Sequence, residues 1–243
     1  MEVLVVGAGA MGQWFAESVA TDDDEITFVD TDEDAAGAGA DRVGGRALTP
    51  PVDEAFDLVC LAVPLPAAGA VIEEYASVAT GAICDVTGSM RGPIDAMGTH
   101  APAIERMSLH PLFAPENAPG NVAVVTDADG PISETVRDRL ADRGNALVET
   151  TPAEHDEAME TVQAGAHTAV LAFAMAAEEV PEAFQTPISE GLFDLVEQVT
   201  GGEARVYADI QAAFDGAEDV ADAARQIAEA DDATFTELYE ELQ

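Results

Sequence analysis

Short apolar runs separated by stretches of mixed polarity fill the first part of the chain. The run Phe56–Val63 (FDLVCLAV) is apolar at all but one position, which is typical of a strand buried on both faces of a parallel sheet. Similar runs predict strands at Val3–Val6, Glu25–Val29, Ala82–Val86, Asn121–Val125 and Ala146–Glu149. The intervening stretches predict helices at Gln13–Ala20, Thr31–Ala40, Ala67–Ala76, Pro93–Met97 and Ile132–Arg143, and a loop at Gly44–Pro51. This alternation predicts an α/β fold with an open, doubly wound parallel sheet, whose ligands bind at the carboxyl ends of the strands.

The pattern changes after Thr151, where strand-like runs give way to helical periodicity. Helices are predicted at Pro152–Glu179, Ser189–Val199, Val206–Phe214, Ala217–Ala228 and Thr234–Leu242. Thr151 and Glu154 have the spacing of a capping box at the start of the first of these helices. The sequence therefore predicts two domains, an α/β domain at residues 1–151 and an all-helical domain at residues 152–243. The apolar faces of such a helical domain favour pairing with a second copy of the chain.

A glycine-rich turn follows the first predicted strand and precedes the first predicted helix. Gly7, Gly9 and Gly12 have G-x-G-x-x-G spacing, and the residues between them are Ala8, Ala10 and Met11. In a dinucleotide site the first glycine makes the tight turn, and the second lets the pyrophosphate approach the backbone. The third lets the helix pack closely on the sheet. The order of strand, turn and helix favours a dinucleotide site, and the alternative is a glycine-rich turn in an unrelated βαβ unit.

An acid at the end of the second predicted strand strengthens the nucleotide interpretation. Asp30 lies about 20 residues past the fingerprint, where an acid binds the ribose 2′-hydroxyl. Its charge would repel a 2′-phosphate, and no Arg follows before Arg42, so NAD is favoured over NADP. Val63 and Pro64 end another strand where the bound cofactor would pass. Residues 1–151 are thus predicted to be a dinucleotide-binding (Rossmann) domain.

Charge is the unusual feature of the composition, with 48 acidic residues against 9 basic ones and a formal net charge of −39. Every basic residue is Arg. Such a surface repels itself at low salt, and molar salt removes that penalty, so we interpret the charge as adaptation to a salty, halophilic cytoplasm. Nucleic-acid and anionic-membrane partners are not expected, because phosphate contacts need clusters of Lys and Arg. No apolar run approaches a membrane span of ~20 residues, and no signal peptide is expected.

Two cysteines, Cys60 and Cys84, fall in separate predicted strands. They are interpreted as buried, reduced thiols of a cytoplasmic protein, with a catalytic thiol as the alternative. A zinc site would show H-E-x-x-H or paired Cys/His spacing, which the sequence lacks. No metal is therefore expected.

Histidines are few, which makes them good candidates for chemistry. His110 is predicted in a loop after a strand, at the carboxyl edge of the sheet. Its ordinary pKa of about 6.5 suits it to take a proton from a hydroxyl being oxidised, and the alternative is a loop histidine bonded to backbone. Gln163 and His167, at i and i+4, share one face of a predicted helix, and burying this polar pair indicates a ligand or cleft. His155 lies in the same helix, where it could instead only orient the first turn.

Several motifs follow one another along almost the whole chain. They are Gly7–Gly12 (GAGAMG), Asp85–Thr87 with Gly92–Ile94 and Met97, His110–Pro115 (HPLFAP), Glu154–His167 (EHDEAMETVQAGAH) and Tyr207–Ile210 (YADI). Together they resemble prephenate dehydrogenases, the NAD-dependent enzymes of tyrosine biosynthesis. HPLFAP and E-H-D-x-x-M-x-x-x-Q-x-x-x-H are the specific part of the resemblance, because the glycine motif alone would not identify a family.

The resemblance implies a nucleotide domain followed by a helical dimerisation domain, in a homodimer. It implies that prephenate is oxidised at its ring hydroxyl carbon, that hydride passes to NAD, and that the ring carboxylate leaves as CO2 to give 4-hydroxyphenylpyruvate. His110 would accept the hydroxyl proton or polarise that oxygen. Glu116 would lie near the mouth of the site, and the residues lining its substrate side would be His155, Gln163 and His167.

Two positions depart from the family pattern. The family carries Ser-x-Lys in one turn where this chain has Thr87-Gly88-Ser89, so Thr87 or Ser89 would hold the catalytic histidine. Where the family carries an arginine for a substrate carboxylate, this chain has Gly216. The favoured replacement is Arg91, in the turn at the carboxyl edge of the sheet. The other candidate cations are Arg106 and Arg205.

Three alternatives remain open from the sequence. Arogenate, which differs from prephenate by a side-chain amine, could be the substrate. Another two-domain NAD(P)-dependent dehydrogenase or reductase of a small carboxylic acid would follow if the absent arginine changed the substrate. A non-catalytic NAD-binding regulator is disfavoured, because a sensor needs no proton acceptor such as His110 beside the nicotinamide.

Overall fold

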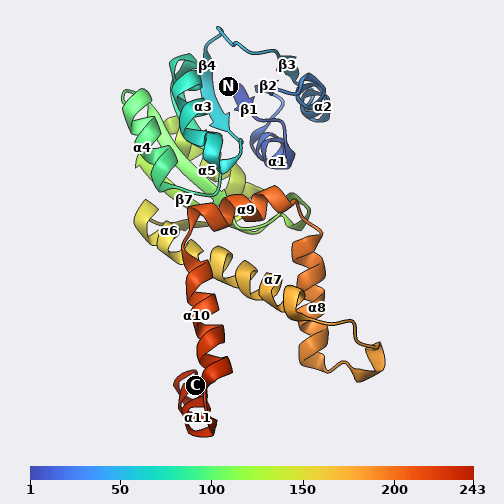
Figure 1. Ribbon diagram of the computed structural model, residues 1–243. Helices are drawn as coiled ribbons and strands as arrows, with labels where there is room; N and C mark the ends of the chain where they lie inside the picture. The colour runs from blue at the N-terminus through green and yellow to red at the C-terminus, as the bar shows by residue number, and fades with distance from the viewer. The chain divides into compact units, whose positions relative to one another are not determined.

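The chain folds into an α/β unit and a helical unit. The computed structural model describes residues 1–243, apart from the side chain of Glu182. Its two compact units are Met1–Asp156 and Glu157–Gln243, and the division falls within the helix α6 (Pro152–Met159). The sheet belongs to the first unit, and the second consists of helices, coloured yellow to red in Figure 1. The predicted fold class is therefore confirmed, while the roles expected of the two parts stay predictions.

A sheet with the strand order β3-β2-β1-β4-β5-β6-β7-β8 forms the centre of the first unit. Its strands are β1 (Glu2–Val6), β2 (Glu25–Val29), β3 (Arg46–Leu48), β4 (Phe56–Leu61), β5 (Ala79–Asp85), β6 (Glu105–Pro111), β7 (Asn121–Ala128) and β8 (Ala146–Glu149). β1 pairs in parallel with β2 on one side and with β4 on the other. The carboxyl ends of β1 and β4 therefore form the switch point where doubly wound sheets bind ligands.

Two features of the sheet differ from the prediction. β7 runs antiparallel to β6, so the sheet is mixed, because the connection 112–120 is shorter than the crossover of about a dozen residues that a parallel pair needs. The predicted loop Gly44–Pro51 contains the edge strand β3, which pairs with β2. A strand of this length is too short to show an apolar periodicity, so the sequence pattern does not predict it.

Helices cover both faces of the sheet. One face carries α1 (Ala10–Val19), α2 (Glu33–Val43) and α5 (Pro131–Asp142), and the other carries α3 (Ala68–Tyr75) and α4 (Arg91–His100). The turns of 3-10 helix are η1 (Leu65–Ala67), η2 (Ala76–Val78) and η3 (Pro115–Asn117). The start of α2 is fixed by Asp32, whose carboxylate accepts hydrogen bonds from the amides of Asp34 and Ala35. Its end is fixed by Gly44, which has a φ of +68°.

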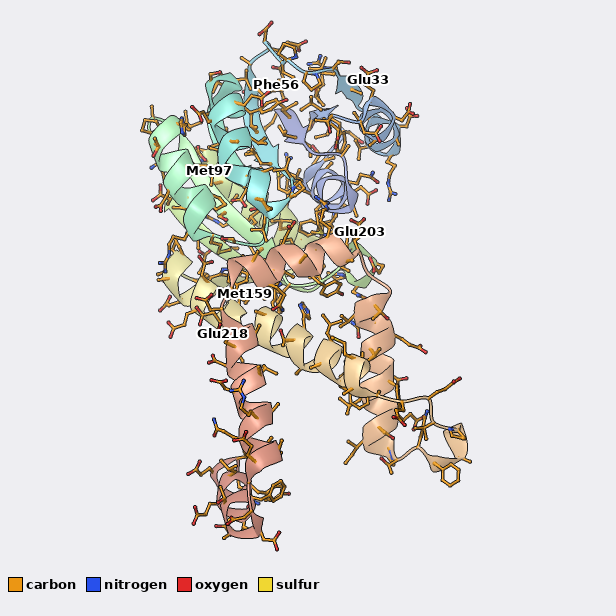
Figure 2. The ribbon with its side chains drawn as sticks, viewed as in Figure 1. Glu33, Phe56, Met97, Met159, Glu203 and Glu218 are labelled. Atoms are coloured by element: carbon orange, nitrogen blue, oxygen red, sulfur yellow. The ribbon has the colours of Figure 1, made fainter. Side chains whose placement is uncertain are left out.

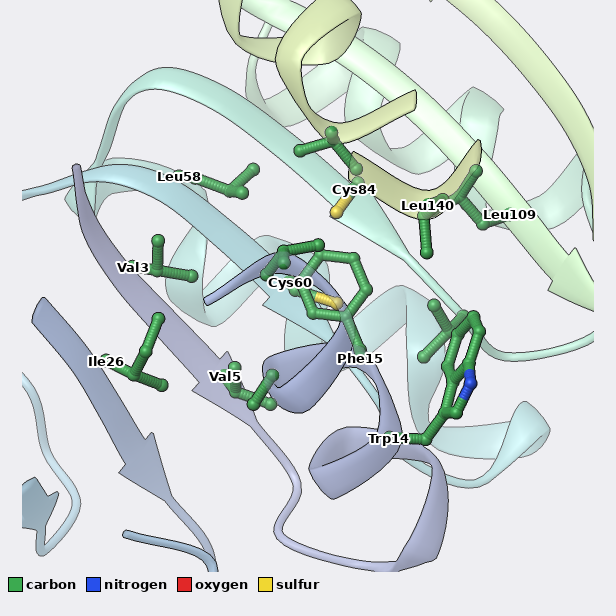
Figure 3. Close-up of a cluster of buried hydrophobic side chains, with 14 of the residues drawn as sticks. Val3, Val5, Trp14, Phe15, Ile26, Leu58, Cys60, Cys84, Leu109 and Leu140 are labelled. Carbon is green, nitrogen blue, oxygen red and sulfur yellow. The ribbon is translucent and has the colours of Figure 1, made fainter. Parts of the chain in front are cut away.

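Strand β4 contributes to both layers of the core, as its unbroken apolar run predicts. Leu58 and Cys60 belong to the layer that contains Phe15 of α1 (Figure 3), whereas Val59 belongs to the opposite layer. Cys60 and Cys84 are neighbours on adjacent strands, and both are buried free thiols. Burial raises the pKa of the Cys60 thiol. The two thiols therefore act as small apolar side chains in the core.

The helical unit contains a π-helical segment where one long helix was expected. The expected helix Pro152–Glu179 consists of α6, the π-helical segment η4 (Glu160–Gly165) and α7 (Ala166–Ala176). The remaining elements are η5 (Glu182–Phe184), α8 (Pro187–Thr200), α9 (Ala204–Ala213), α10 (Gly216–Glu229) and α11 (Asp232–Glu241). Met159 (labelled in Figure 2) forms a small buried cluster with Ala164, Ile210 and Phe214. Tertiary packing of α9 and α10 on η4 thus accompanies the change in helical geometry.

A buried carboxylate connects the start of the sheet to α5. Asp24 accepts hydrogen bonds from the terminal ammonium of Met1 at 2.7 Å and from Arg139 at 2.6 Å. Burial alone would raise the pKa of Asp24, but hydrogen bonds from Met1, Thr21 and Arg139 outweigh it and lower the pKa to about 2. This ion pair therefore stabilises the folded state wherever the carboxylate is ionised.

Replacing this carboxylate by an amide should destabilise the fold. Asp24→Asn is expected to lower the free energy of unfolding by about 2 kcal/mol at neutral pH, since each pKa unit corresponds to about 1.4 kcal/mol. The deficit should shrink as the pH falls from about 4 towards 2, where the wild-type carboxylate gains its proton. Urea titrations in molar KCl measure it, with the exposed Asp23→Asn as the control of equal charge. Equal decreases in the free energy of unfolding in the two variants would show that the ion pair of Asp24 does not stabilise the fold.

Candidate active site

The turn after β1 has the close packing that its glycine spacing predicts. Gly7 has a φ of +100°, and a Cβ there would collide with the carbonyl of Ala62, just after β4. A Cβ on Gly12 would collide with the carbonyl of Gly7. A Cβ on Gly9, in contrast, would meet no atom within 4 Å. The first and third glycines are therefore required for packing, and the second borders open space.

The open side of this turn fits the phosphates of a dinucleotide. Gly9 directly precedes α1, and no described side chain caps the first amides of that helix, which leaves them available to an anion. Asp30 lies beside the turn, because its Oδ2 accepts a hydrogen bond from the amide of Ala8 at 2.7 Å. Val63 is partly buried beside Gly7, and Pro64 is exposed. The predicted cofactor residues are thus gathered at the switch point of the sheet.

His110 lies in β6, and the expectation that it belongs to a loop is wrong. The strand extends to Pro111 because β7 pairs with it here, with Ala123 opposite His110. Its position at the carboxyl end of β6 is nevertheless the one expected, since β6 runs parallel to β5. The side chain is 7% exposed. A nearly buried imidazole therefore sits at the ligand-binding edge of the sheet.

A chain of hydrogen bonds leads from His110 to the start of α4. Nδ1 of His110 lies 2.8 Å from Nε2 of His155, and Nδ1 of His155 lies 2.8 Å from Oδ1 of Asp156. The same carboxylate accepts hydrogen bonds from the amides of Met90 at 3.2 Å and Arg91 at 3.3 Å. The N-terminal end of a helix stabilises a carboxylate in this position. Asp156 is thus held as a carboxylate beneath the histidine pair.

Burial sets the charge state of His110. Burial lowers the pKa of His110 to about 3, helped by His155 and opposed by Asp156. The pKa of Asp156 is lowered too, because its hydrogen bonds from His155 and the two amides outweigh the effect of burial. At neutral pH His110 is therefore a neutral imidazole, the form that can accept a proton.

The turn after β5 borders the other face of His110. Gly88 has a φ of +96°, and a Cβ there would lie 3.3 Å from Nε2 of His110. The hydroxyl of Thr87 donates to Asp85 at 2.6 Å, and Ser89 is partly buried. Burial raises the pKa of Asp85 to about 6 despite this hydrogen bond. At Nδ1 the histidine is bonded to His155, and the role of holding it that is expected of Thr87 or Ser89 stays a prediction.

The predicted polar residues of the first unit have different surroundings. Arg91 begins α4 and is exposed, and Glu116 is exposed in η3. Arg106 lies at the amino end of β6 and forms an ion pair with Asp127 at 2.7 Å. Because His110 is at the other end of that strand, Arg106 is removed from the candidates for a cation beside the histidine.

Gln163 and His167 belong to the helical unit. Gln163 lies in the π-helical segment and His167 in α7, so their expected α-helical i, i+4 relation is interrupted by the wider turn. His167 packs edge-on against Tyr207, with ring centroids 4.9 Å apart. Burial lowers the pKa of His167. This aromatic contact was not predicted, since it joins α7 to α9.

Gly216 occupies a position where no side chain fits. A Cβ there would collide with the carbonyl of Glu160 in the π-helical segment. An arginine could stand at this position only if the backbone of α10 or η4 moved. Arg205, another candidate cation, is exposed in α9 next to Glu203. The absence of the expected arginine is therefore explained by backbone packing.

Asp156 is the site residue that sequence reasoning missed. Its position in the E-H-D motif, directly after His155, was the available signal.

The described residues contain no cluster of three or more metal-ligating side chains. Among them there is also no helix with the length and apolar character needed to cross a bilayer.

Comparisons of the sequence with known proteins identify its relatives. Residues 2–87 match the family model described as NADP oxidoreductase, coenzyme F420-dependent. The chain is 32% identical to 4-amino-4-deoxyprephenate dehydrogenase of Streptomyces pristinaespiralis over 269 aligned residues, covering 99% of this chain and 89% of that protein. It is 25% identical to a probable arogenate/prephenate dehydrogenase of Methanocaldococcus jannaschii, covering 86% of this chain and 50% of that protein.

A solved structure shares the fold across the whole chain. Prephenate dehydrogenase from A. aeolicus, in complex with hydroxyphenyl propionate and NAD+, superposes with a TM-score of 0.75 at 16% identity, covering 100% of this chain and 96% of that one. This structural similarity establishes the fold, whereas the 32% identity across nearly the full length establishes the family. The chain belongs to the prephenate dehydrogenase family of oxidoreductases.

Proposed function

We propose that this chain is an NAD-dependent dehydrogenase that converts prephenate into 4-hydroxyphenylpyruvate and CO2, a step of tyrosine biosynthesis. The observation that carries the proposal is the neutral, buried His110 at the same sheet edge as the glycine turn. Hydride-transfer sites need both a nucleotide-binding turn and a group that accepts the hydroxyl proton. A non-catalytic regulator would need only the first.

The turn Gly7–Gly12 would hold the pyrophosphate of NAD against the backbone of Gly9 and the first amides of α1. Asp30 would bind the ribose hydroxyls, and its charge disfavours the 2′-phosphate of NADP. Val63 and Pro64 border the same space. When bound, NAD supplies the acceptor for the hydride that leaves the substrate.

His110 would accept the ring hydroxyl proton at Nε2. The electron pair of the broken O–H bond then forms the carbonyl as the carbon-bound hydrogen leaves as hydride. The ring carboxylate leaves as CO2, and its bonding pair enters the ring, which becomes aromatic with a phenolate oxygen. His110 returns its proton to that oxygen and is again neutral. Since aromatisation favours this sequence, orientation of the substrate is the main task left to the protein.

Arg91 is the proposed cation for a substrate carboxylate. In the described structure every arginine except Arg91 and Arg143 forms an ion pair with an acid. The amide of Arg91 donates to Asp156, so this residue adjoins the histidine pair. The further proposed substrate ligands, by their place in the family motifs, are Gln163, His167 and Glu116.

Two related substrates are the main rivals. 4-Amino-4-deoxyprephenate is favoured by the name of the relative with 32% identity, and it carries an amine in place of the ring hydroxyl. Arogenate is named for the M. jannaschii relative and carries its amine on the side chain. A neutral imidazole accepts a hydrogen bond from a hydroxyl or an amine, so His110 suits either ring substituent.

The two units are proposed to divide the work. Residues 1–151 would bind the dinucleotide, and residues 152–243 would contribute to substrate binding and form a homodimer. Large apolar side chains are exposed in the helical unit, including Met175 at 89%, Ile188 at 79% and Leu242 at 85%. Exposed apolar surface of this kind is typical of an interface between chains.

Assaying turnover with defined substrates tests the proposed function. The purified protein in molar KCl should form NADH when given prephenate and NAD, with slower turnover of arogenate and of 4-amino-4-deoxyprephenate. NADP should support less activity than NAD, because Asp30 opposes the extra phosphate. Faster turnover of 4-amino-4-deoxyprephenate would transfer the assignment to that substrate. Binding of NAD without turnover of any of the three substrates would contradict the proposed dehydrogenase activity.

Removing the proton acceptor should abolish most of the activity. His110→Asn is expected to reduce kcat by roughly 10²–10⁴ while NAD still binds, because the hydroxyl loses its general base. Isothermal titration with NAD and circular dichroism would show that the site and the fold persist. His100→Asn, at the exposed end of α4, is the matched control. A near-normal rate for His110→Asn would exclude this histidine from the chemistry.

The open space beside Gly9 predicts a selective effect on the cofactor. Gly9→Ala should fold as wild type, since its Cβ meets no protein atom within 4 Å. The same Cβ would stand where the pyrophosphate approaches, so the Kd for NAD should rise by about 10-fold or more. Gly98→Ala in α4, also with free space around the Cβ, is the control. An unchanged Kd for NAD would place the pyrophosphate elsewhere.

A further inference from the structure

Both ring nitrogens of His155 are bonded to other side chains. Nε2 faces Nδ1 of His110 and Nδ1 faces Oδ1 of Asp156, each at 2.8 Å. The residue is 3% exposed. The sequence motif assigns His155 to the substrate side, but an imidazole with both nitrogens bonded in this way has none left for a polar contact with substrate.

The hydrogen-bond chain determines which nitrogen carries each proton. A carboxylate accepts hydrogen bonds and cannot donate them, so Asp156 requires an N–H at Nδ1 of His155. When each imidazole carries one proton, Nε2 of His155 has the lone pair and accepts the N–H at Nδ1 of His110. The lone pair of His110 is then at Nε2. This is the atom that lies beside Gly88.

The anchor of this chain is unusually well fixed. Asp156 accepts hydrogen bonds from the amides of Met90 and Arg91 in addition to His155. Main-chain donors at the start of a helix cannot rotate away, and they favour the ionised carboxylate. Gly88, on the opposite side of His110, has no side chain with which to orient the ring. The hydrogen bond with His155 at Nδ1 therefore orients the ring of His110.

We infer that His155 and Asp156 are positioning residues that keep Nε2 of His110 free of a proton and share the proton it takes from the substrate. The inference rests on the proposed function, in which His110 is the proton acceptor. When Nε2 of His110 gains the substrate proton, the Nδ1–H bond of His110 breaks and an N–H bond forms at Nε2 of His155. The positive charge then lies on His155, next to Asp156. The reverse movement supplies the proton for the phenolate oxygen.

Charge explains why such sharing helps. An imidazolium at His110 is opposed by burial, which lowers the pKa of this residue to about 3. An imidazolium at His155 is paired directly with the carboxylate of Asp156. Asp85 also interacts electrostatically with His155, and burial raises the pKa of Asp85 to about 6. Moving the charge by one imidazole thus places it in direct contact with the carboxylate of Asp156.

Nitrogen-15 NMR of the histidine rings tests the proton positions without any substrate. Only four histidines are present, so single His→Asn variants assign every ring. Both His110 and His155 should carry their proton on Nδ1 in the wild type. In Asp156→Asn this preference should be lost, because an amide can donate to Nδ1 of His155 and reverse both tautomers. Glu157→Gln, an exposed neighbour with the same change of charge, should leave both tautomers unaltered.

Kinetics test the sharing of the proton. Asp156→Asn should reduce kcat by roughly 10–10²-fold with little change in KM, because the proton acceptor is weaker and misoriented. The acid limb of kcat/KM should move to lower pH, since Asp156 raises the pKa of His110 and its loss lowers it. His155→Gln can still accept a hydrogen bond from Nδ1 of His110 but cannot hold a proton. It should preserve the His110 tautomer and still lose activity.

Two outcomes would overturn the inference. One is a wild-type His110 with its proton on Nε2. The other is Asp156→Asn with the tautomers and the pH profile of Glu157→Gln. Failure of the proposed function is distinguishable, because it would appear as no turnover of any substrate by the wild type, whereas the tautomers are read in the absence of substrate.

Discussion

The close approach of the glycine turn to β4 is the contact on which the ligand-binding edge depends. Gly7 and Ala62 bring two parallel strands together so tightly that no side chain fits between them, and Gly12 lets α1 lie against the same turn. The alignment of helix and sheet then leaves the amides at the start of α1 facing the open space beside Gly9. A larger residue at Gly7 or Gly12 would push apart the elements that create that space.

Burial has two opposing effects on the ability of His110 to act as a base. Excluding water keeps the imidazole neutral and strengthens every interaction inside the site, but it also makes the ring reluctant to hold a proton. Elements that are distant in sequence contribute the groups that surround the imidazole. β6 contributes His110, α6 contributes His155 and Asp156, and α4 contributes two amides. In the proposed function, this combination would make His110 a neutral but usable base, since a buried histidine without such partners would be inert at neutral pH.

The sequence predicted what local patterns determine. The apolar run around Cys60 specified a strand buried on both faces, and the glycine spacing specified the turn and its tight packing. The direction of β7, the strand position of His110 and the π-helical segment were mispredicted because each depends on a distant partner. Gly216 contacts Glu160 only in the folded chain. Likewise, the hydrogen bond between His110 and His155 joins residues whose adjacency no periodicity encodes.

The net charge must also be compatible with the dianionic substrate of the proposed reaction. A surface with a formal charge of −39 would repel such a molecule at low salt. At molar salt the Debye length is about 3 Å, so exposed acids beyond direct contact exert little force, while a cation touching the carboxylate still acts at full strength. Few cations are then sufficient, provided that they are not already paired with acids. Arg91, without an ion pair in the described structure and next to the anchor of the histidine pair, meets that condition, and this is why a scarcity of basic residues is compatible with the proposed reaction.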